Sequence, residues 1–209
     1  MVICANFETN LKNFTGSKYS VGVGNATDAM EIFLQAIGVS DGDEIIISSH
    51  TMLATASAIV ANRAKPIPVD IGPDNLIDPV AVESAISPRT VGVMPTQLNG
   101  RTCNMDEIQS IVKKNSLFLV EDAAQSLGSK FKGKSAGTFG LASCISFFPA
   151  KSFSGSYFDT GESSINLIAE SYQVDSKDTL LVGLEFKLSP GWHTYWKNPG
   201  DSGEGATIK

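Results

Sequence analysis

Apolar residues in the first three quarters of the chain fall into short runs, which alternate with longer segments of helical spacing. Short, almost continuously apolar runs are typical of strands that are buried on both faces of a parallel sheet. The pattern predicts strands at 19–23, 44–48, 66–69, 91–94, 117–120 and 143–147. Strands separated in this way by helices predict an α/β fold with three layers and a mostly parallel sheet.

Two of the intervening segments carry a clear apolar face. Residues 28–37 and 105–114 place their apolar side chains three and four positions apart, which is helical spacing. Asn104 precedes the second segment as a predicted N-cap, with Glu107 at the capping-box position. We therefore expect two amphipathic helices over these ranges.

The pattern changes after Gly155. Residues 164–172 and 179–188 are predicted strands without a helix between them, and apolar and charged residues alternate in the second. Such alternation is typical of an antiparallel sheet with one solvated face. We expect a domain of residues 1–153 followed by a β segment of residues 154–209, which is near the lower size limit for a stable core.

Composition and charge argue against some classes of function. The chain has 209 residues, 42% hydrophobic and 18% charged, as in an ordinary globular protein. Its net charge of -6 argues against a broad surface for nucleic acid. No apolar run is long enough for a membrane span and no basic-then-apolar leader opens the chain, so we expect a cytoplasmic protein without a membrane segment.

The cysteines and histidines indicate no metal site. Cys4, Cys103 and Cys144 are widely spaced, and His50 and His193 are isolated. Neither a metal-binding spacing nor a disulfide framework is present, so we interpret the cysteines as buried or idle thiols.

A glycine-rich segment at 22–28 joins the first predicted strand to the first predicted helix. Backbone amides and the positive end of a helix would converge there, which favours a phosphate. The alternative is a plain helix N-cap at Asn25 or Thr27 that binds nothing.

Glu121 and Asp122 follow the predicted strand at 117–120. Ligands of parallel sheets usually bind at this edge, and because neighbouring side chains on a strand point in opposite directions, only one of the two can face a site. A buried carboxylate opposite a cationic ring nitrogen would stay ionised and keep that nitrogen protonated. The alternative is an acid pair that favours the dipole at a helix N-terminus.

Lys151 comes shortly after the last predicted strand of the first domain. Taken alone, it is a solvated loop lysine. If it were desolvated beside cationic groups, its amine would become a nucleophile that can bond covalently to a carbonyl carbon.

Over residues 6–151, these signals in this order resemble the DegT/DnrJ/StrS family of pyridoxal-phosphate sugar aminotransferases. The motifs that carry the resemblance are GNATDA (24–29), DGDEII (41–46), TMLATA (51–56), PVDI (68–71), PTQLNGR (95–101), EDAAQ (121–125) and SFFPAK (146–151). The resemblance implies an incomplete large domain of PLP-dependent transferase fold type I. It also implies pyridoxal 5'-phosphate (PLP) as the cofactor.

The resemblance implies two catalytic residues. Lys151 would hold the cofactor covalently and move a proton between the substrate carbon and the cofactor, and Asp122 would pair with the ring nitrogen. The implied reaction transfers an amino group, commonly from glutamate, to a keto sugar attached to a nucleotide. Polysaccharide biosynthesis and a homodimer with sites at its interface are implied as well.

The same resemblance places five further residues at the cofactor. Ala26, Thr27 and Ser146 would bind its phosphate, and Gln125 would lie by the ring hydroxyl. Met52 falls where the family usually has an aromatic residue that stacks on the ring, so stacking would be weaker here.

The last 50 residues or so, about 160–209, resemble the opening of the immunoglobulin-like N-terminal domain of DsbD-type thiol:disulfide interchange proteins. The resemblance rests on GWHTYW (191–196) and NPGDSG (198–203). It implies part of a periplasmic module whose redox cysteines this chain does not reach. We expect a chimera of two gene fragments, so the alternatives to an aminotransferase are an accessory binding module and an inactive truncation.

Overall fold

A computed structural model of the chain describes residues 2–147, 158–159, 163–169 and 182–188. The chain divides into two compact units, Met1–Ser156 and Tyr157–Lys209. Each unit is considered by itself below. No helix in the described part has the length and apolar character that a bilayer span requires.

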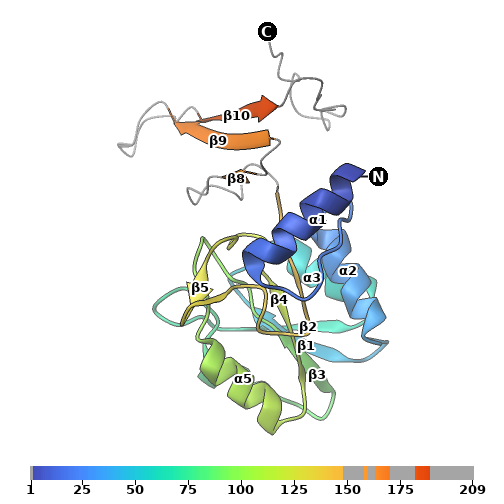
Figure 1. The fold of residues 1–209 in the computed structure, drawn as a ribbon. Coiled ribbons are helices and arrows are strands. Elements are labelled where there is room, and N and C mark those ends of the chain that lie inside the picture. Colours follow the sequence, from blue (N-terminus) through green and yellow to red (C-terminus); the bar gives the residue numbers. More distant parts are fainter. Residues whose placement is uncertain (1, 148–157, 160–162, 170–181, 189–209) are drawn as a thin grey trace. The chain divides into compact units, whose positions relative to one another are not determined.

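A five-stranded parallel sheet forms the centre of the first unit, in the order β2-β1-β3-β4-β7 (Figure 1). The strands are β1 (Glu44–Ser48), β2 (Lys65–Val69), β3 (Thr90–Met94), β4 (Phe118–Asp122) and β7 (Ala142–Cys144). They confirm five of the six strands predicted from apolar runs, the last of them shortened at its end. A two-residue hairpin, β5 (Lys130–Phe131) and β6 (Lys134–Ser135), lies between β4 and β7.

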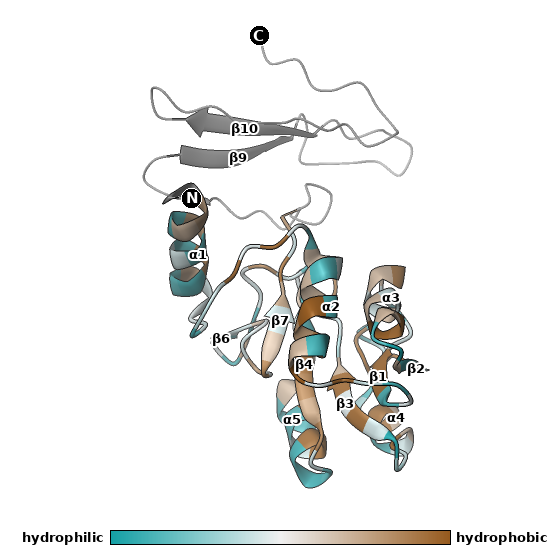
Figure 2. Cartoon of the chain, turned by 90° about the vertical axis from the view of Figure 1, so that its right-hand side faces the viewer, coloured by the Kyte–Doolittle hydropathy of each residue, from teal (hydrophilic) through white to brown (hydrophobic). Residues whose placement is uncertain are grey.

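Helices cover both faces of this sheet. They are α2 (Ala26–Ala36), α3 (Leu53–Ala61), α4 (Pro79–Ser84) and α5 (Met105–Lys114), whereas α1 (Val2–Thr15) contributes to neither core cluster. Buried residues of α2 and α3 share one core cluster with the sheet, and those of α4 and α5 share another. Figure 2 shows hydrophobic residues along β1, β3 and β4, between these helices. The three-layer α/β prediction is thereby confirmed.

Strand β1 shows how the continuous apolar run produces this arrangement. Ile45 and Ile47 pack with α2 and α3, whereas Ile46 packs with α4 and α5. All three are at most 3% exposed. Because both faces of this part of β1 are buried, its apolar residues do not alternate with polar ones.

The predicted strand at 19–23 is wrong. These residues are neither helix nor strand, and Tyr19 and Val21 are 74% and 77% exposed. The Gly22 amide donates to Glu8 Oε1 at 2.7 Å, so α1 takes up a backbone donor that a strand would need. Glycine also weakens a strand by offering no side chain to pack.

Both amphipathic helices are confirmed, with different caps. α2 starts two residues earlier than expected, and its N-cap Asn25 accepts from the Asp28 amide through Oδ1. The capping box expected for α5 is wrong in detail: Asn104 caps no backbone amide, and its Nδ2 donates to Glu107 Oε1 at 2.5 Å. The two side chains satisfy each other instead.

Gly92 in β3 makes the sheet sensitive to a single methyl group. A Cβ added there would lie 2.1 Å from Cε2 of Phe118, its register partner on β4. We expect Gly92→Ala to lower the free energy of unfolding by about 1–3 kcal/mol, the usual cost of overpacking. Urea unfolding measures this, and Gly92→Ala combined with Phe118→Leu should recover part of the loss. An unchanged midpoint for Gly92→Ala would contradict the observed packing.

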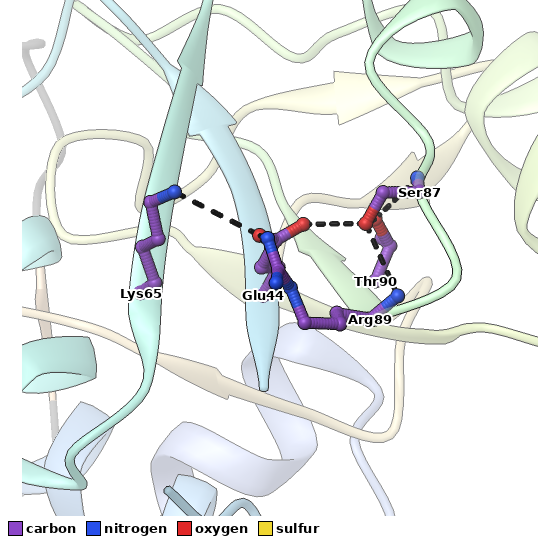
Figure 3. A network of polar contacts seen from close by, with 5 residues as sticks. All are labelled: Glu44, Lys65, Ser87, Arg89 and Thr90. Atoms are coloured by element: carbon purple, nitrogen blue, oxygen red, sulfur yellow. Dashed lines mark hydrogen bonds and ion pairs between the residues drawn. The ribbon is translucent and has the colours of Figure 1, made fainter. Parts of the chain in front are cut away.

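Glu44 opens β1 at the edge of the sheet where the parallel strands begin, and its side chain is only 5% exposed (Figure 3). Ser87 donates to Glu44 Oε2 at 2.5 Å, and Arg89 donates to Oε1 through Nη2 at 2.8 Å. Lys65 Nζ lies 3.8 Å from the same oxygen. The hydrogen bond from Ser87, followed by those from Arg89, holds the pKa of Glu44 below its ordinary value of 4.5.

This lowered pKa predicts how stability depends on pH. A carboxyl group with a lower pKa in the folded state stabilises the fold above its ordinary pKa and loses that effect as the pH falls through the folded value. We expect Glu44→Gln to be less stable than the unmodified chain at neutral pH, with a difference that shrinks below pH 4.5. Chemical unfolding over a pH series measures it. Glu83→Gln, at a more exposed ion pair with Lys114, is the control; a pH-independent difference for Glu44→Gln would be the contrary result.

The second unit holds an antiparallel sheet of β8 (Phe158–Asp159), β9 (Ser163–Ala169) and β10 (Val182–Leu188), in the order β10-β9-β8. β9 and β10 pair from Ser163 opposite Leu188 to Ala169 opposite Val182. Two antiparallel strands in this region are confirmed. The remainder of the predicted ranges, 170–172 and 179–181, lies outside the described residues.

Candidate functional site

The carboxyl ends of β1, β3, β4 and β7 meet at one edge of the sheet, and Asp122 lies there. Asp122 ends β4, opposite Cys144 at the end of β7. The Asp122 amide donates to Pro95 O, and Asp122 O accepts from the Gln97 amide just after β3. Backbone hydrogen bonds on both sides therefore fix the position of Asp122.

The carboxylate of Asp122 is buried, with 3% of the residue exposed. Oδ2 accepts from Thr55 Oγ1 at 2.6 Å, and Oδ1 accepts from the Ala124 amide at 3.1 Å and from Cys144 Sγ at 3.3 Å. Among the ion pairs of the described residues, none involves Asp122. Burying a carboxylate without a cation is costly, so such a group is a candidate for binding a cationic ligand atom.

A chain of threonine hydroxyls leads to Asp122. Thr51 Oγ1 lies 2.7 Å from Thr55 Oγ1 and 2.7 Å from Thr96 Oγ1. Thr55 and Thr96 are at most 2% exposed. These three threonines, which we call the threonine chain, connect the ends of β1 and β3 with the carboxylate at the end of β4.

Glu121, the other acid of the pair, points to the opposite face of the sheet. It is fully buried and accepts four hydrogen bonds, from Gln97 Nε2 at 2.8 Å and from the amides of Gly137, Phe139 and Gly140 at 2.6–3.0 Å. These bonds tie the loop before β7 to β4. The two neighbouring acids thus have separate sets of partners, as expected for adjacent residues of a strand. The alternative of a helix N-terminus is wrong, because turns follow Asp122.

The first turn of α2 holds two of the residues predicted to contact a phosphate, Ala26 and Thr27. Asn25 caps the amide of Asp28, and its Nδ2 donates to Asp28 Oδ2 at 2.9 Å. Ala26 is buried in the same core cluster as Ala124 and Cys144, so the start of α2 packs beside the ends of β4 and β7. Thr27 follows Ala26 in the first turn and is partly buried.

Three further predicted residues, Met52, Gln125 and Ser146, come after strands that end at this edge. Met52 is the residue before α3 and is 50% exposed, three positions from Thr55. Gln125 is partly buried, and its carbonyl oxygen accepts from the Gly100 amide at 2.8 Å. Ser146 follows β7 by two residues and is also partly buried. Lys151 lies outside the described residues.

Of the three cysteines that were interpreted as buried or idle thiols, Cys103 and Cys144 are buried, whereas Cys4 is exposed. Burial raises the pKa of Cys103 to about 12, so its thiol stays protonated at neutral pH. The described residues contain no cluster of His, Cys, Asp or Glu able to hold a metal ion.

Sequence reasoning assigned no role to Thr51, Thr55 and Thr96. Each lies shortly after a strand that ends at the edge where Asp122 lies. That placement is the signal that could have drawn attention to them. Their contacts nevertheless join residues 45 and 67 positions apart, which no local pattern reveals.

Comparisons with known proteins agree with this geometry. Residues 3–164 match the DegT/DnrJ/EryC1/StrS aminotransferase family. The chain is 41% identical over 155 residues to the UDP-2-acetamido-2-deoxy-3-oxo-D-glucuronate aminotransferase of Pseudomonas aeruginosa, covering 74% of this chain and 43% of that protein.

Two solved structures share the fold of the described domain. DesV of Streptomyces venezuelae, in complex with a ketimine intermediate, has a TM-score of 0.63 and 35% identity over 65% of this chain and 37% of its own. The PLP form of the putative sugar aminotransferase Spr1654 from Streptococcus pneumoniae has a TM-score of 0.63 and 29% identity over 66% of this chain and 39% of its own.

The chain spans about two fifths of the length of the curated relatives that it matches, 41% and 43% for two of them. The matched region contains the five-stranded sheet, both core clusters and every residue predicted to contact the cofactor. These matches, together with the geometry described above, show that the chain belongs to the DegT/DnrJ/EryC1/StrS aminotransferase family.

Proposed function

We propose that this chain supplies the cofactor site of a PLP-dependent aminotransferase that acts on nucleotide-linked keto sugars. The observation that carries the proposal is the buried carboxylate of Asp122, which lies at the carboxyl edge of a parallel sheet without a cation from the described residues. Crevices at this edge are where α/β sheets bind their ligands.

The residues present fit PLP. Its ring nitrogen, when protonated, is the cation that Asp122 lacks, and carboxylate and pyridinium form a charge-assisted hydrogen bond. Its phosphate suits the first turn of α2, where Asn25 takes up the Asp28 amide and the described hydrogen bonds leave the amides of Ala26 and Thr27 available. Ser146 and Gln125 would add contacts to the phosphate and the ring hydroxyl, and Met52 would cover the ring.

When bound, PLP supplies an electron sink for the carbon that gains or loses a proton. Asp122 keeps the ring nitrogen charged, which strengthens that sink. Lys151 would hold the cofactor covalently and would move the proton to and from the substrate carbon as a general base and acid. The overall transfer is balanced: glutamate loses its amino group to become 2-oxoglutarate, and the ketone carbon of the sugar gains that group.

The substrate class is proposed from the relatives. The Pseudomonas aeruginosa protein is named for a UDP-linked 3-oxo sugar, and another relative, from Streptomyces venezuelae, for a dTDP-linked amino sugar. We infer a nucleotide-linked keto sugar as the acceptor, an amino acid as the donor, and a homodimer located in the cytoplasm. The net charge of -6 argues against a nucleic acid as a binding partner.

Formation of 2-oxoglutarate tests the proposal. The purified chain with PLP, glutamate and a nucleotide-linked keto sugar should release 2-oxoglutarate in a one-to-one ratio with the amino sugar. Asp122→Ala, under the same conditions, should release both products far more slowly. Bound PLP with no 2-oxoglutarate formed would contradict the proposed reaction.

Nothing in the comparisons supports a DsbD-type domain in this chain. Most of residues 160–209, including both motifs of that resemblance, lies outside the described residues. The described antiparallel strands are compatible with many β folds, so the immunoglobulin-like interpretation stays a prediction. Thiol:disulfide interchange and a chimeric origin form no part of the proposed function.

A further inference from the structure

The direction of every hydrogen bond in the threonine chain can be worked out from its acceptor. The ionised Asp122 carboxylate has no proton to give, so Thr55 donates its only hydroxyl proton to Oδ2, at 2.6 Å. Thr55 must then accept from Thr51, at 2.7 Å. Since the proton of Thr51 is also used, Thr51 accepts from Thr96, at 2.7 Å.

All three hydroxyls therefore donate toward one charge, in the order Thr96, Thr51, Thr55, Asp122. Hydrogen bonds aligned in this way polarise one another, and the effect is larger where water is excluded. Thr96, Thr55 and Asp122 are each at most 3% exposed, which meets that condition. The threonine chain thus strengthens the hydrogen bond that Thr55 donates to Oδ2 of Asp122.

The other groups around Asp122 add donors and no cation. The Ala124 amide and the Cys144 thiol donate to Oδ1, and among the described residues Cys144 is the titratable group in contact with the carboxylate. Hydrogen bonds donated to a carboxylate favour its charged form over its protonated form. Among the described residues, the groups that contact the Asp122 carboxylate are hydrogen-bond donors, and no ion pair reaches it.

We propose that Thr96, Thr51 and Thr55 are positioning residues that orient the Asp122 carboxylate and, through the hydrogen bond that they donate to it, hold the shared proton on the ring nitrogen of the bound cofactor. The inference rests on the proposed function. Without the donated hydrogen bond, Asp122 competes more strongly for that proton, and the ring nitrogen becomes less protonated. The threonine chain thus controls where one proton lies in the site.

The test measures the protonation of the ring nitrogen directly. PLP labelled with 15N in its ring is bound to the purified chain, and the 15N chemical shift is recorded at one fixed pH. Thr55→Val keeps the shape of the side chain and removes its hydroxyl, whereas Thr55→Ser retains a donor. Thr51→Val and Thr96→Val interrupt the hydrogen bonds of the threonine chain without removing a donor that contacts Asp122. Thr102→Val, whose hydroxyl pairs with Ser129, is the matched control.

We expect the 15N signal of Thr55→Val to move from the pyridinium position toward that of neutral pyridine, and Thr55→Ser to restore it. Thr51→Val and Thr96→Val should move it the same way by less, and Thr102→Val should leave it unchanged. A purely structural role would alter stability without this graded shift.

An unchanged 15N signal in every valine variant that binds PLP would overturn the inference. If Thr55→Val does not fold, Thr51→Val and Thr96→Val decide the question, since neither leaves a buried carboxylate oxygen without its donor. Failure of the unmodified chain to bind PLP would instead count against the proposed function.

Discussion

Replacing Asp122 by alanine is expected to reduce the rate of 2-oxoglutarate formation by about 100-fold or more. Loss of one partner of a buried charge pair costs on the order of 2–5 kcal/mol, and each 1.4 kcal/mol corresponds to about tenfold. The Asp122 carboxylate is the described group positioned to neutralise a cationic ring, and Thr55, Ala124 and Cys144 all point their donors at it. Asp122→Asn, which keeps the shape and removes the charge, should lose nearly as much.

Asp70 provides a control for this experiment. It follows β2 at the same edge of the sheet but is exposed, and it has no side-chain hydrogen bond among the described residues. We expect Asp70→Ala to retain most of the rate. Circular dichroism and urea unfolding separate loss of function from loss of fold. Equal rates for Asp122→Ala and Asp70→Ala, with both folded, would exclude Asp122 from the site.

Glu121→Ala is expected to destabilise the fold by about 3–5 kcal/mol, the range for removing a group that leaves buried polar partners unsatisfied. Gln97 Nε2 and the amides of Gly137, Phe139 and Gly140 all lose their acceptor. Leaving the four donors without partners costs more than losing the side chain itself. For a chain of this length, the midpoint of thermal unfolding should fall by roughly 6–20 °C.

The matched control is Glu107→Ala, an exposed acid in the first turn of α5. It should change the free energy of unfolding by no more than about 0.5 kcal/mol, as surface substitutions usually do. Urea unfolding of both variants provides the comparison. A loss for Glu121→Ala no larger than that for Glu107→Ala would show that the four hydrogen bonds do not stabilise the fold.

The central strands could be predicted because burial on both faces leaves a signal at every position. The apolar run 44–48 had to lie inside a sheet, and its isoleucines do contact both layers of helices. The same reasoning failed at 19–23, where apolar residues alternate with glycine but are exposed. An apolar pattern identifies residues that suit a strand and does not reveal whether a neighbouring strand pairs with them.

Three helices were missed, α1, α3 and α4, and the last two lack an amphipathic pattern. α3 is built from small and apolar residues on every side, and α4 has only six residues. Neither offers a window long enough to separate helical from extended spacing. Their positions follow from the sheet they cover rather than from their own sequence.

The site was predicted in part. Alternation along β4 showed that Glu121 and Asp122 face opposite ways, but only the family resemblance indicated which of them faces the cofactor. The threonine chain could not be predicted, because it depends on three strand ends meeting at one edge in a specific register. Backbone pairing brings Thr96 beside Asp122, and no local motif encodes that pairing.

The central claim is that PLP binds at the edge formed by Asp122 and α2 and is held by Lys151. Reduction of the PLP-loaded chain with borohydride fixes the cofactor to whichever amine holds it, and mass spectrometry of the peptides locates it. We expect one pyridoxyl group per chain, on Lys151, and a marked loss of that labelling in Asp122→Ala. Labelling scattered over surface lysines such as Lys130 and Lys134, or equal labelling of Lys151 with and without Asp122, would contradict it.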